Sequence, residues 1–478
     1  MYICETNQTD FIMKIRKVKW DNHPILGNLE LDFVNPITQQ PYDNILFAGE
    51  NGTGKTSILN SISSFLDGYP IEYIEYIEYF TENQILRAVA HIENGTINYE
   101  YVEQGFYDVI KVDNGERLFI GSGKNKRGGS TSNPSVDNNP LNIRFSGCVL
   151  SKARADFQTN PITATTNRQL DEANKDLDSD ENFTSLKQLI IDIESQDNSE
   201  YAKINREAGN NPIAWNTFYN TSKVYRFKNA FNTFFDKIKY DRVIDNSKEK
   251  TLQFLKNNAA ITVDSLSTGE KQIVFRGAFL LKNNKKLNGS IVMIDEPELS
   301  MHPKWQGRIL QYYKTLFIES DGTQKAQLFF ATHSEHVLKE ALSNRNENLV
   351  IILTEKVGII KSKRIDAPAV LPSITNAETN YLAFDLISND YHIELYGWLQ
   401  QKRLLYTVTQ CDRYIKSTLQ YDVSKHEKIS TFTRRDGSTT TYYTLPTYIR
   451  NCIDHPNSGA SFSDEELRTS INLLIQLV

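Results

Sequence analysis

The N-terminal part of the chain alternates apolar with polar residues, which is the pattern of half-buried β-strands. Within residues 11–34, Met13, Ile15, Val18 and Trp20 recur at a spacing near two, ahead of an Asn-His-Pro turn. The pattern predicts two strands joined by that turn.

Three further patterns lie between residues 70 and 140. Residues 85–120 predict antiparallel strands, because Asn94-Gly95 and Asn114-Gly115 are strong hairpin-turn signals. Residues 71–79 repeat Ile-Glu-Tyr three times. A period of three fits neither strand nor helix, although the Ile and Tyr content favours extended structure. Residues 121–140 are rich in glycine, serine and asparagine and predict a loop.

Continuous apolar runs predict buried strands at residues 44–48, 291–294 and 327–331. Residues 56–66 follow the first run after a short glycine-rich segment and have apolar residues at helical spacing. Residues 44–66 therefore predict a strand, a glycine-rich turn and a helix.

The remaining segments are mainly helical or form hairpins. Residues 166–260 favour helix but contain no sustained heptads, which excludes a long coiled coil. Residues 303–319 predict a helix, and 349–353 with 357–360 a closing hairpin. After residue 366 the chain is aromatic and mixed, and it ends in a helix that begins with the capping-box sequence Ser463-Asp464-Glu465-Glu466.

Length and composition indicate a globular protein of several folding units. The chain has 478 residues, 39% hydrophobic and 23% charged, with a net charge of −6, which excludes a strongly basic nucleic-acid-binding domain overall. Four scattered cysteines form no pair typical of zinc sites or disulfide frameworks. We find no signal-peptide core and no apolar stretch of membrane-spanning length, and therefore expect a cytoplasmic protein.

Residues 49–56 fit the pattern G-x-x-x-x-G-K-[ST] at every defined position. Glycines let consecutive backbone N–H groups face a polyphosphate at the positive end of the following helix. Lys55 is expected to reach the β- and γ-phosphates, and the Thr56 hydroxyl to bind Mg²⁺. The predicted nucleotide-binding residues of this loop are Gly49, Glu50, Asn51, Gly52, Thr53, Gly54, Lys55, Thr56 and Ser57.

The predicted strand 291–294 ends in Asp295 and Glu296. Two carboxylates at the end of a buried strand must hold a cation or perform acid–base chemistry, because isolated buried charge is costly. We expect Asp295 to bind Mg²⁺, directly or through water, and Glu296 to polarise the water that attacks the γ-phosphate.

Two more segments predict contacts with nucleotide. Ser267 is predicted to cap a helix start that also contains Thr268, Gly269 and Glu270, and such a helix start is an anion site. A second anion site in one chain suggests that two copies close over ATP. His333 follows the predicted strand 327–331, where a histidine can sense the γ-phosphate through a hydrogen bond.

These four segments, in this order, resemble the ABC-type ATPases, particularly the RecF/SMC/OLD branch. Residues 49–56 match Walker A, 266–270 the signature, 291–296 Walker B and 331–334 the histidine switch. The signature departs from the common form at Thr268 and Glu270, as in RecF-like ATPases rather than transporters. The order also places Gln158 as a weak match to the Q-loop metal ligand.

The resemblance implies an α/β fold: an ATPase head with a mixed or parallel sheet and phosphate loop, a helical insertion, and a mainly helical accessory domain. The head would comprise residues 1–120 and 261–365, the loop and helical insertion 121–260, and the accessory and interaction domain 366–478. ATP and Mg²⁺ are the implied cofactors.

Within that branch the chain is most similar to the anti-phage defence ATPases of the PtuA type, found in Septu and retron-associated systems, with the ATPase of PARIS as an alternative. This resemblance implies ATP-dependent homodimers, higher oligomers and an HNH-type nuclease partner like PtuB. No acidic cluster typical of the OLD nuclease follows residue 340.

Two other functions stay open. Arg450-Asn451-Cys452-Ile453-Asp454-His455 resembles the R-N-x-x-x-H motif of HEPN ribonucleases, in which Arg and His would cut RNA. Asp454 and Pro456 instead predict a turn, and a structural Arg–His pair is the simpler interpretation. A RecF-like DNA repair ATPase, with nucleic acid as a partner, fits the head equally well.

Overall fold

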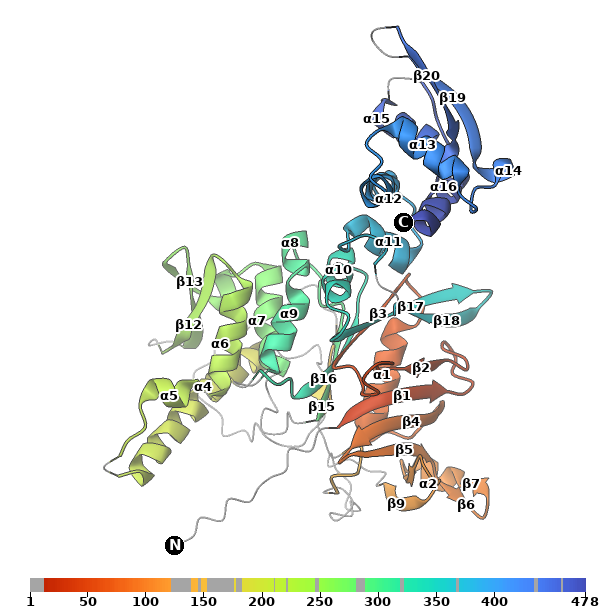
Figure 1. The fold of residues 1–478 in the computed structure, drawn as a ribbon. Helices are drawn as coiled ribbons and strands as arrows, with labels where there is room; N and C mark the ends of the chain where they lie inside the picture. Colours follow the sequence, from red (N-terminus) through yellow and green to blue (C-terminus); the bar gives the residue numbers. More distant parts are fainter. Residues whose placement is uncertain are drawn as a thin grey trace. The chain divides into compact units, whose positions relative to one another are not determined.

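The computed structural model describes two compact units, Met1–Arg364 and Ile365–Val478 (Figure 1). The described residues are 13–121, 139–144, 148–152, 176–177, 183–209, 211–220, 222–245, 249–280, 289–318, 322–366, 369–433, 437–456 and 459–478. Each unit has its own hydrophobic core.

The first unit is built around a mixed sheet in the order β11-β10-β15-β16-β3-β17-β18. Its strands are β3 (Asn44–Gly49), β10 (Cys148–Ser151), β11 (Asp176–Leu177), β15 (Ser290–Asp295), β16 (Ala326–Ala331), β17 (Asn348–Lys356) and β18 (Ile359–Arg364). All pairs are parallel except β17 with β18. The predicted buried strands and closing hairpin are confirmed, as is the α/β fold class.

The strand order explains why distant motifs meet. β16 lies between β15 and β3, with Asp295 paired to Ala331 and Ala331 to Phe47. Because parallel strands end at the same edge of a sheet, the segments that follow these three strands converge there. The helix α1 (Lys55–Leu66) leaves this edge, buries Ile58 and Leu59, and packs against β3, β10, β15 and β16.

A second, antiparallel sheet has the order β2-β1-β4-β5-β8-β9. Its strands are β1 (Lys14–Trp20), β2 (Glu30–Asp32), β4 (Ile74–Thr81), β5 (Gln84–Ala90), β8 (Tyr107–Lys111) and β9 (Arg117–Gly121). Most of the Ile-Glu-Tyr repeat forms β4, so its extended structure is confirmed. The predicted hairpin at Asn94-Gly95 joins the short strands β6 (Ile92–Glu93) and β7 (Thr96–Ile97), and a helix that we did not predict, α2 (Tyr99–Glu103), follows.

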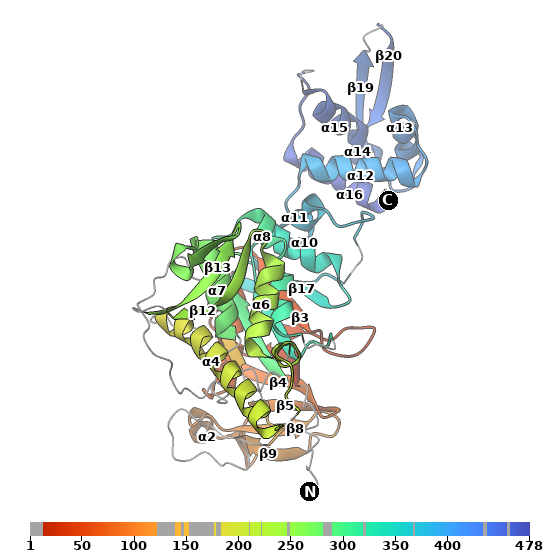
Figure 2. The ribbon, with the colours of Figure 1, turned by 90° about the vertical axis from the view of Figure 1, so that its left-hand side faces the viewer.

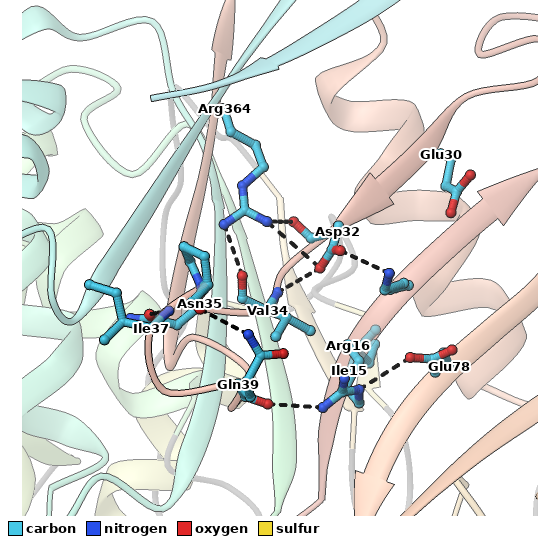
Figure 3. A network of polar contacts seen from close by, with 12 residues as sticks. Ile15, Arg16, Glu30, Asp32, Val34, Asn35, Ile37, Gln39, Glu78 and Arg364 are labelled. Atoms are coloured by element: carbon cyan, nitrogen blue, oxygen red, sulfur yellow. Dashed lines mark hydrogen bonds and ion pairs between the residues drawn. The ribbon is translucent and has the colours of Figure 1, made fainter. Parts of the chain in front are cut away.

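Polar contacts fasten this sheet to the edge of the central one (Figure 3). The Arg364 guanidinium, at the end of β18, donates to the carbonyl oxygens of Asp32 (3.0 Å) and Val34 (2.9 Å). Arg16 spans Glu78 and the Gln39 carbonyl, at 3.2 Å each. The Arg364 contacts therefore join the two sheets, and those of Arg16 join β1 to β4 and to the loop after β2.

The insertion between β11 and β15 is helical only in part (Figure 2). It contains α4 (Phe183–Glu207), α5 (Trp215–Tyr219) and α6 (Lys223–Phe234), then the antiparallel strands β12 (Ile238–Asp245), β13 (Lys250–Lys256) and β14 (Ala259–Thr262). The helical interpretation of 166–260 is wrong for the strands, which form consecutive hairpins; Asn257 and Asn258 adopt the positive φ of a tight turn between two of them. After η1 (Val263–Ser265) the chain enters α7 (Thr268–Leu280).

Three shorter helices complete the first unit. The single helix predicted over 303–319 is broken at Gly307 into α8 (Pro303–Gln306) and α9 (Ile309–Leu316). Beyond β16, α10 (Glu335–Ser343) begins at the N-cap Ser334, whose side chain accepts from the Val337 N–H.

The second unit is mainly helical, with one hairpin. Its elements are α11 (Asn376–Phe384), α12 (Asn389–Lys402), α13 (Val408–Ser417), α14 (Val423–His426), β19 (Glu427–Thr433), β20 (Thr439–Thr444), α15 (Leu445–Asp454) and α16 (Asp464–Leu477). The predicted capping box at Ser463 is confirmed. Among the described residues of the chain, no helix combines the length and apolarity needed to span a bilayer.

Candidate functional site

The loop between β3 and α1 has the backbone that its glycines allow. Gly49, Gly52 and Gly54 have φ values of 144°, 84° and 86°, which side-chain-bearing residues rarely adopt. A Cβ on Gly49 would lie 2.2 Å from the Leu353 carbonyl oxygen, so that position has no room for a side chain. No side chain caps the N-terminus of α1. The backbone N–H groups of its first turn therefore remain available to an anion.

Lys55 lies inside this loop and is only 5% exposed. Its Nζ donates to the carbonyl oxygens of Gly49 and Glu50, both at 2.8 Å. Burial lowers the pKa of Lys55 to about 8, against the opposing effect of the acidic groups Asp295, Glu296 and Glu298. The anionic oxygens of a polyphosphate would compensate for the water that this buried ammonium has lost.

Thr56 and Asp295 meet although they are 239 positions apart in the chain. The Thr56 Oγ1 lies 3.2 and 3.1 Å from the two Asp295 carboxylate oxygens. Burial raises the pKa of Asp295, and its hydrogen bond from Thr56 opposes that shift. A hydroxyl beside a carboxylate is an oxygen donor pair that suits Mg²⁺. The described residues contain no group of three or more His, Cys, Asp or Glu side chains placed to hold a metal. Mg²⁺ here would therefore take its other ligands from phosphate and water.

Glu296 follows Asp295 with a left-handed backbone, φ 44°, which is strained for a residue with a side chain. Its N–H donates to the Ala331 carbonyl (2.9 Å), and its own carbonyl accepts from Arg276 Nη1 (2.9 Å). Arg276, on α7, also binds the Asp295 carbonyl and the Ser151 hydroxyl and carbonyl. The buried Arg276 guanidinium thus joins α7, the helix that begins at the signature segment, to the ends of β10 and β15.

His333 is placed beside Glu296 by a second carboxylate, Glu298. His333 Nε2 lies 4.0 Å from Glu296 Oε1, and both side chains are about one-third exposed. Glu298 is 9% exposed, and its Oε1 accepts from Thr332 Oγ1 and the His333 N–H, both at 2.8 Å. Burial and then the Lys55 charge lower the pKa of His333, which keeps the imidazole neutral at pH 7.

The signature segment forms a capped helix start, as predicted. The Ser267 N–H donates to Glu270 Oε2 at 2.8 Å, and Glu270 Oε1 pairs with Lys256 Nζ at 3.0 Å. A Cβ on Gly269 would lie 2.8 Å from the Ser300 carbonyl oxygen. Glu270 is therefore bound within its own chain, while Ser267 and Thr268 are exposed.

Three residues predicted for other roles, Gln158, Arg450 and His455, have different outcomes. Gln158 lies outside the described residues, so its place in the site stays a prediction. In the second unit, Arg450 Nη2 pairs with Asp454 Oδ2 at 2.6 Å. His455 follows α15 and stacks on Phe432 with ring centroids 4.8 Å apart. Both residues have partners typical of a structural role.

Sequence reasoning missed Arg276, Glu298 and Thr332. Glu298 had a local signal, since it stands two residues after Glu296. Arg276 had none: it lies mid-helix, and its partners at Ser151 and Asp295 are 125 and 19 positions away.

Comparisons with known proteins agree with this geometry at the level of family. A family model described as "AAA domain, putative AbiEii toxin, Type IV TA system" matches residues 45–339. The "Retron Vc95 probable ATPase" of Vibrio cholerae serotype O1 biovar El Tor is 30% identical over 111 residues. That match covers 21% of this chain and 20% of the relative, so the chain matches about a fifth of the relative's length.

Two of the solved structures that align with the chain are SMC head domains. An SMC head bound to the C-terminal winged-helix domain of ScpA aligns with 74% of this chain and 98% of its own, at 13% identity and a TM-score of 0.40. The SMC head domain from Thermotoga maritima aligns with 74% of this chain and 100% of its own, at 13% identity and a TM-score of 0.35.

Proposed function

The chain belongs to the AAA_21 family of AAA-domain ATPases, and on that premise we propose that it binds and hydrolyses ATP as the regulatory subunit of a bacterial anti-phage defence complex. The observation that carries the proposal is the convergence of Lys55, Thr56 and Asp295 at one edge of the central sheet. The similarity to a retron ATPase supports the defence role.

The residues of the site divide the work as follows. Lys55 exchanges its two loop carbonyls for phosphate oxygens. Thr56 and Asp295 would hold Mg²⁺, which would supply positive charge to neutralise the phosphate oxygens. Glu296 accepts a proton from the attacking water, and the neutral His333 donates a hydrogen bond toward the γ-phosphate. Arg276 and Glu298 keep these last two groups in place.

Closure of two copies over ATP would use the exposed start of α7. Ser267 and Thr268 would contact the γ-phosphate held by the other copy's loop, and ATP would thus control association. From the resemblance of the sequence to PtuA-type ATPases, we infer that the regulated partner is an HNH-type nuclease and that higher oligomers form.

Nucleotide binding is tested with Lys55→Ala by calorimetry with ATP and Mg²⁺. We expect loss of binding, whereas Lys203→Ala, which removes a side chain 70% exposed on α4, should bind normally. ATP binding by Lys55→Ala at the wild-type affinity would refute the assignment of the loop.

Closure is tested by mixing two inactive variants. Ser267→Arg should block closure with ATP still bound, and mixing it with Lys55→Ala should restore one hybrid site and part of the turnover. No recovery would count against a shared site.

Co-purification with the product of the neighbouring gene, followed by plasmid and tRNA cleavage assays, tests the nuclease partner. Cleavage of tRNA by this chain alone would favour the ribonuclease alternative instead.

A further inference from the structure

The insertion carries a cavity that shares no residue with the ATP site. It has a volume of about 280 Å³ and is bounded by α4, α5, α6 and β12. Its lining residues are Glu194, Asn198, Trp215, Asn216, Tyr219, Val224, Lys228, Tyr240, Asp241 and Arg242. Binding pockets for small ligands start near ~300 Å³, so this cavity has room for one aromatic base but not for two.

One wall of the cavity is aromatic and open to solvent. α5 buries none of its residues, and Trp215 remains 38% exposed. The rings of Trp215 and Tyr219 lie side by side, with centroids 5.6 Å apart and planes 31° apart. Tyr201 packs edge-on against Trp215 at 4.8 Å and fixes the orientation of the indole. An oriented, exposed indole beside a cavity is a stacking surface for a planar ligand.

The lining also includes the Glu194 carboxylate, which two groups of the insertion hold in place. Glu194 accepts from the Tyr240 hydroxyl at 2.7 Å and from the Val243 N–H at 3.2 Å. A carboxylate has about four acceptor positions, so capacity for further donors remains. Burial raises the pKa of Glu194, and added N–H donors from a ligand would stabilise its charged form.

The cavity also contains two cationic side chains. Lys228 Nζ lies 3.3 Å from the Asp241 carbonyl and 5.9 Å from the centre of the Tyr219 ring. The Arg242 side chain is 67% exposed and lies 3.7 Å from the Asp241 carboxylate. Lys228 and Arg242 would repel a guanidinium or ammonium ligand, and the carboxylates of Glu194 and Asp241 would repel a simple anion. A nucleotide suits both kinds of charged group, because its base edge can donate hydrogen bonds to a carboxylate and its negative phosphate can contact the cationic side chains.

We propose that this cavity binds one guanine nucleotide unit. The base stacks on Trp215 and Tyr219, its N1–H and N2–H donate to Glu194, and Lys228 and Arg242 neutralise the phosphate. Adenine lacks that pair of donors and would not form these two hydrogen bonds to Glu194. The same chemistry is offered by a free guanine nucleotide and by an unpaired guanine in single-stranded nucleic acid.

The test uses the full-length Lys55→Ala protein, so that the phosphate loop contributes no nucleotide binding. Tryptophan fluorescence and calorimetry are followed while GMP, AMP and short single-stranded oligonucleotides with or without guanine are added. We expect saturable binding of GMP, with AMP at least about tenfold weaker, since AMP cannot form the paired hydrogen bonds to the Glu194 carboxylate. If the guanine oligonucleotide binds more tightly than GMP, the ligand of this cavity is single-stranded nucleic acid. If GMP binds more tightly, the ligand is a free guanine nucleotide.

Variants separate the roles of the lining residues. Glu194→Gln should remove the preference for guanine, and Lys228→Met should weaken GMP about tenfold, whereas Lys203→Met, a matched change on exposed α4 surface, should have no effect. Trp215→Phe should keep calorimetric binding but lose most of the fluorescence change, and thermal unfolding checks that each variant folds. Equal affinity for GMP and AMP, or an unchanged guanine preference in Glu194→Gln, would overturn the proposal without affecting the ATP site.

Discussion

Replacing Glu298 by alanine would separate the Asp295–Ser300 segment from the segment that carries His333. The Glu298 carboxylate is buried between them, and its Oε1 accepts from the Thr332 hydroxyl and the His333 N–H at 2.8 Å each. Thr332 is fully buried and its Oγ1 also accepts from the Ser334 N–H at 3.0 Å, so these contacts form a continuous chain. Removal of one side chain therefore leaves two buried donors without their acceptor.

The expected cost is set by opposing effects. Each hydrogen bond to a charged group contributes about 1.5–3 kcal/mol. Burial raises the pKa of Glu298, and its Oε2 has no hydrogen-bond partner among the described residues, so the desolvated charge offsets part of that gain. We expect Glu298→Ala to lower the free energy of unfolding by about 2–4 kcal/mol. Glu298→Gln keeps the Oε1 acceptor and should cost less than about 1.5 kcal/mol.

The assay combines urea unfolding with steady-state ATP turnover. Because Glu298 holds the His333 backbone rather than the nucleotide, Glu298→Ala should reduce kcat at least about tenfold with a nearly unchanged Kd for ATP, and Glu298→Gln should recover most of the loss. Wild-type turnover in Glu298→Ala, or an equal loss in both variants, would refute the positioning role.

Four further outcomes are expected. The pKa of Lys55 near 8 predicts that ATP affinity falls as pH rises through 8, because ATP binding requires the ammonium form. Near that pH, ATP binding should also take up protons, which calorimetry in two buffers of different ionisation enthalpy measures. An ATP affinity that does not change between pH 7 and 9 would contradict this expectation. Glu296→Gln should bind ATP, hydrolyse it at least about a hundredfold more slowly and form a dimer that light scattering detects; unchanged turnover would remove Glu296 from the chemistry. Arg276→Met should destabilise the fold by about 2–4 kcal/mol and lower kcat, because several backbone and hydroxyl acceptors at the ends of β10 and β15 lose their donor. If the variant and the wild type are equally stable in urea, this guanidinium is dispensable for the fold. Gly49→Ala should lower the melting temperature and abolish ATP binding, because its Cβ has no room, and a variant that binds ATP normally would contradict the loop geometry.

The most local features of the protein were predictable from sequence. The phosphate loop is one contiguous run whose glycines are required by the backbone of the loop itself, and the buried strands β3, β15 and β16 are short apolar runs. Each of these signals depends on neighbours within a few residues. Sequence order, through the family resemblance, then indicated that the separate motifs belong to one site.

Tertiary structure decided the rest. The strand order β15-β16-β3 brings His333 between the phosphate loop and Asp295, and no local pattern encodes that order. The strands of residues 238–262 lie in a stretch whose overall polarity favoured a helical interpretation, and antiparallel pairing with one another stabilises them. Arg276 and Glu298 are defined by partners that only the folded chain supplies. Local backbone preferences follow from adjacent residues, whereas pairing, burial and hydrogen bonding across the fold depend on residues that are distant in the chain.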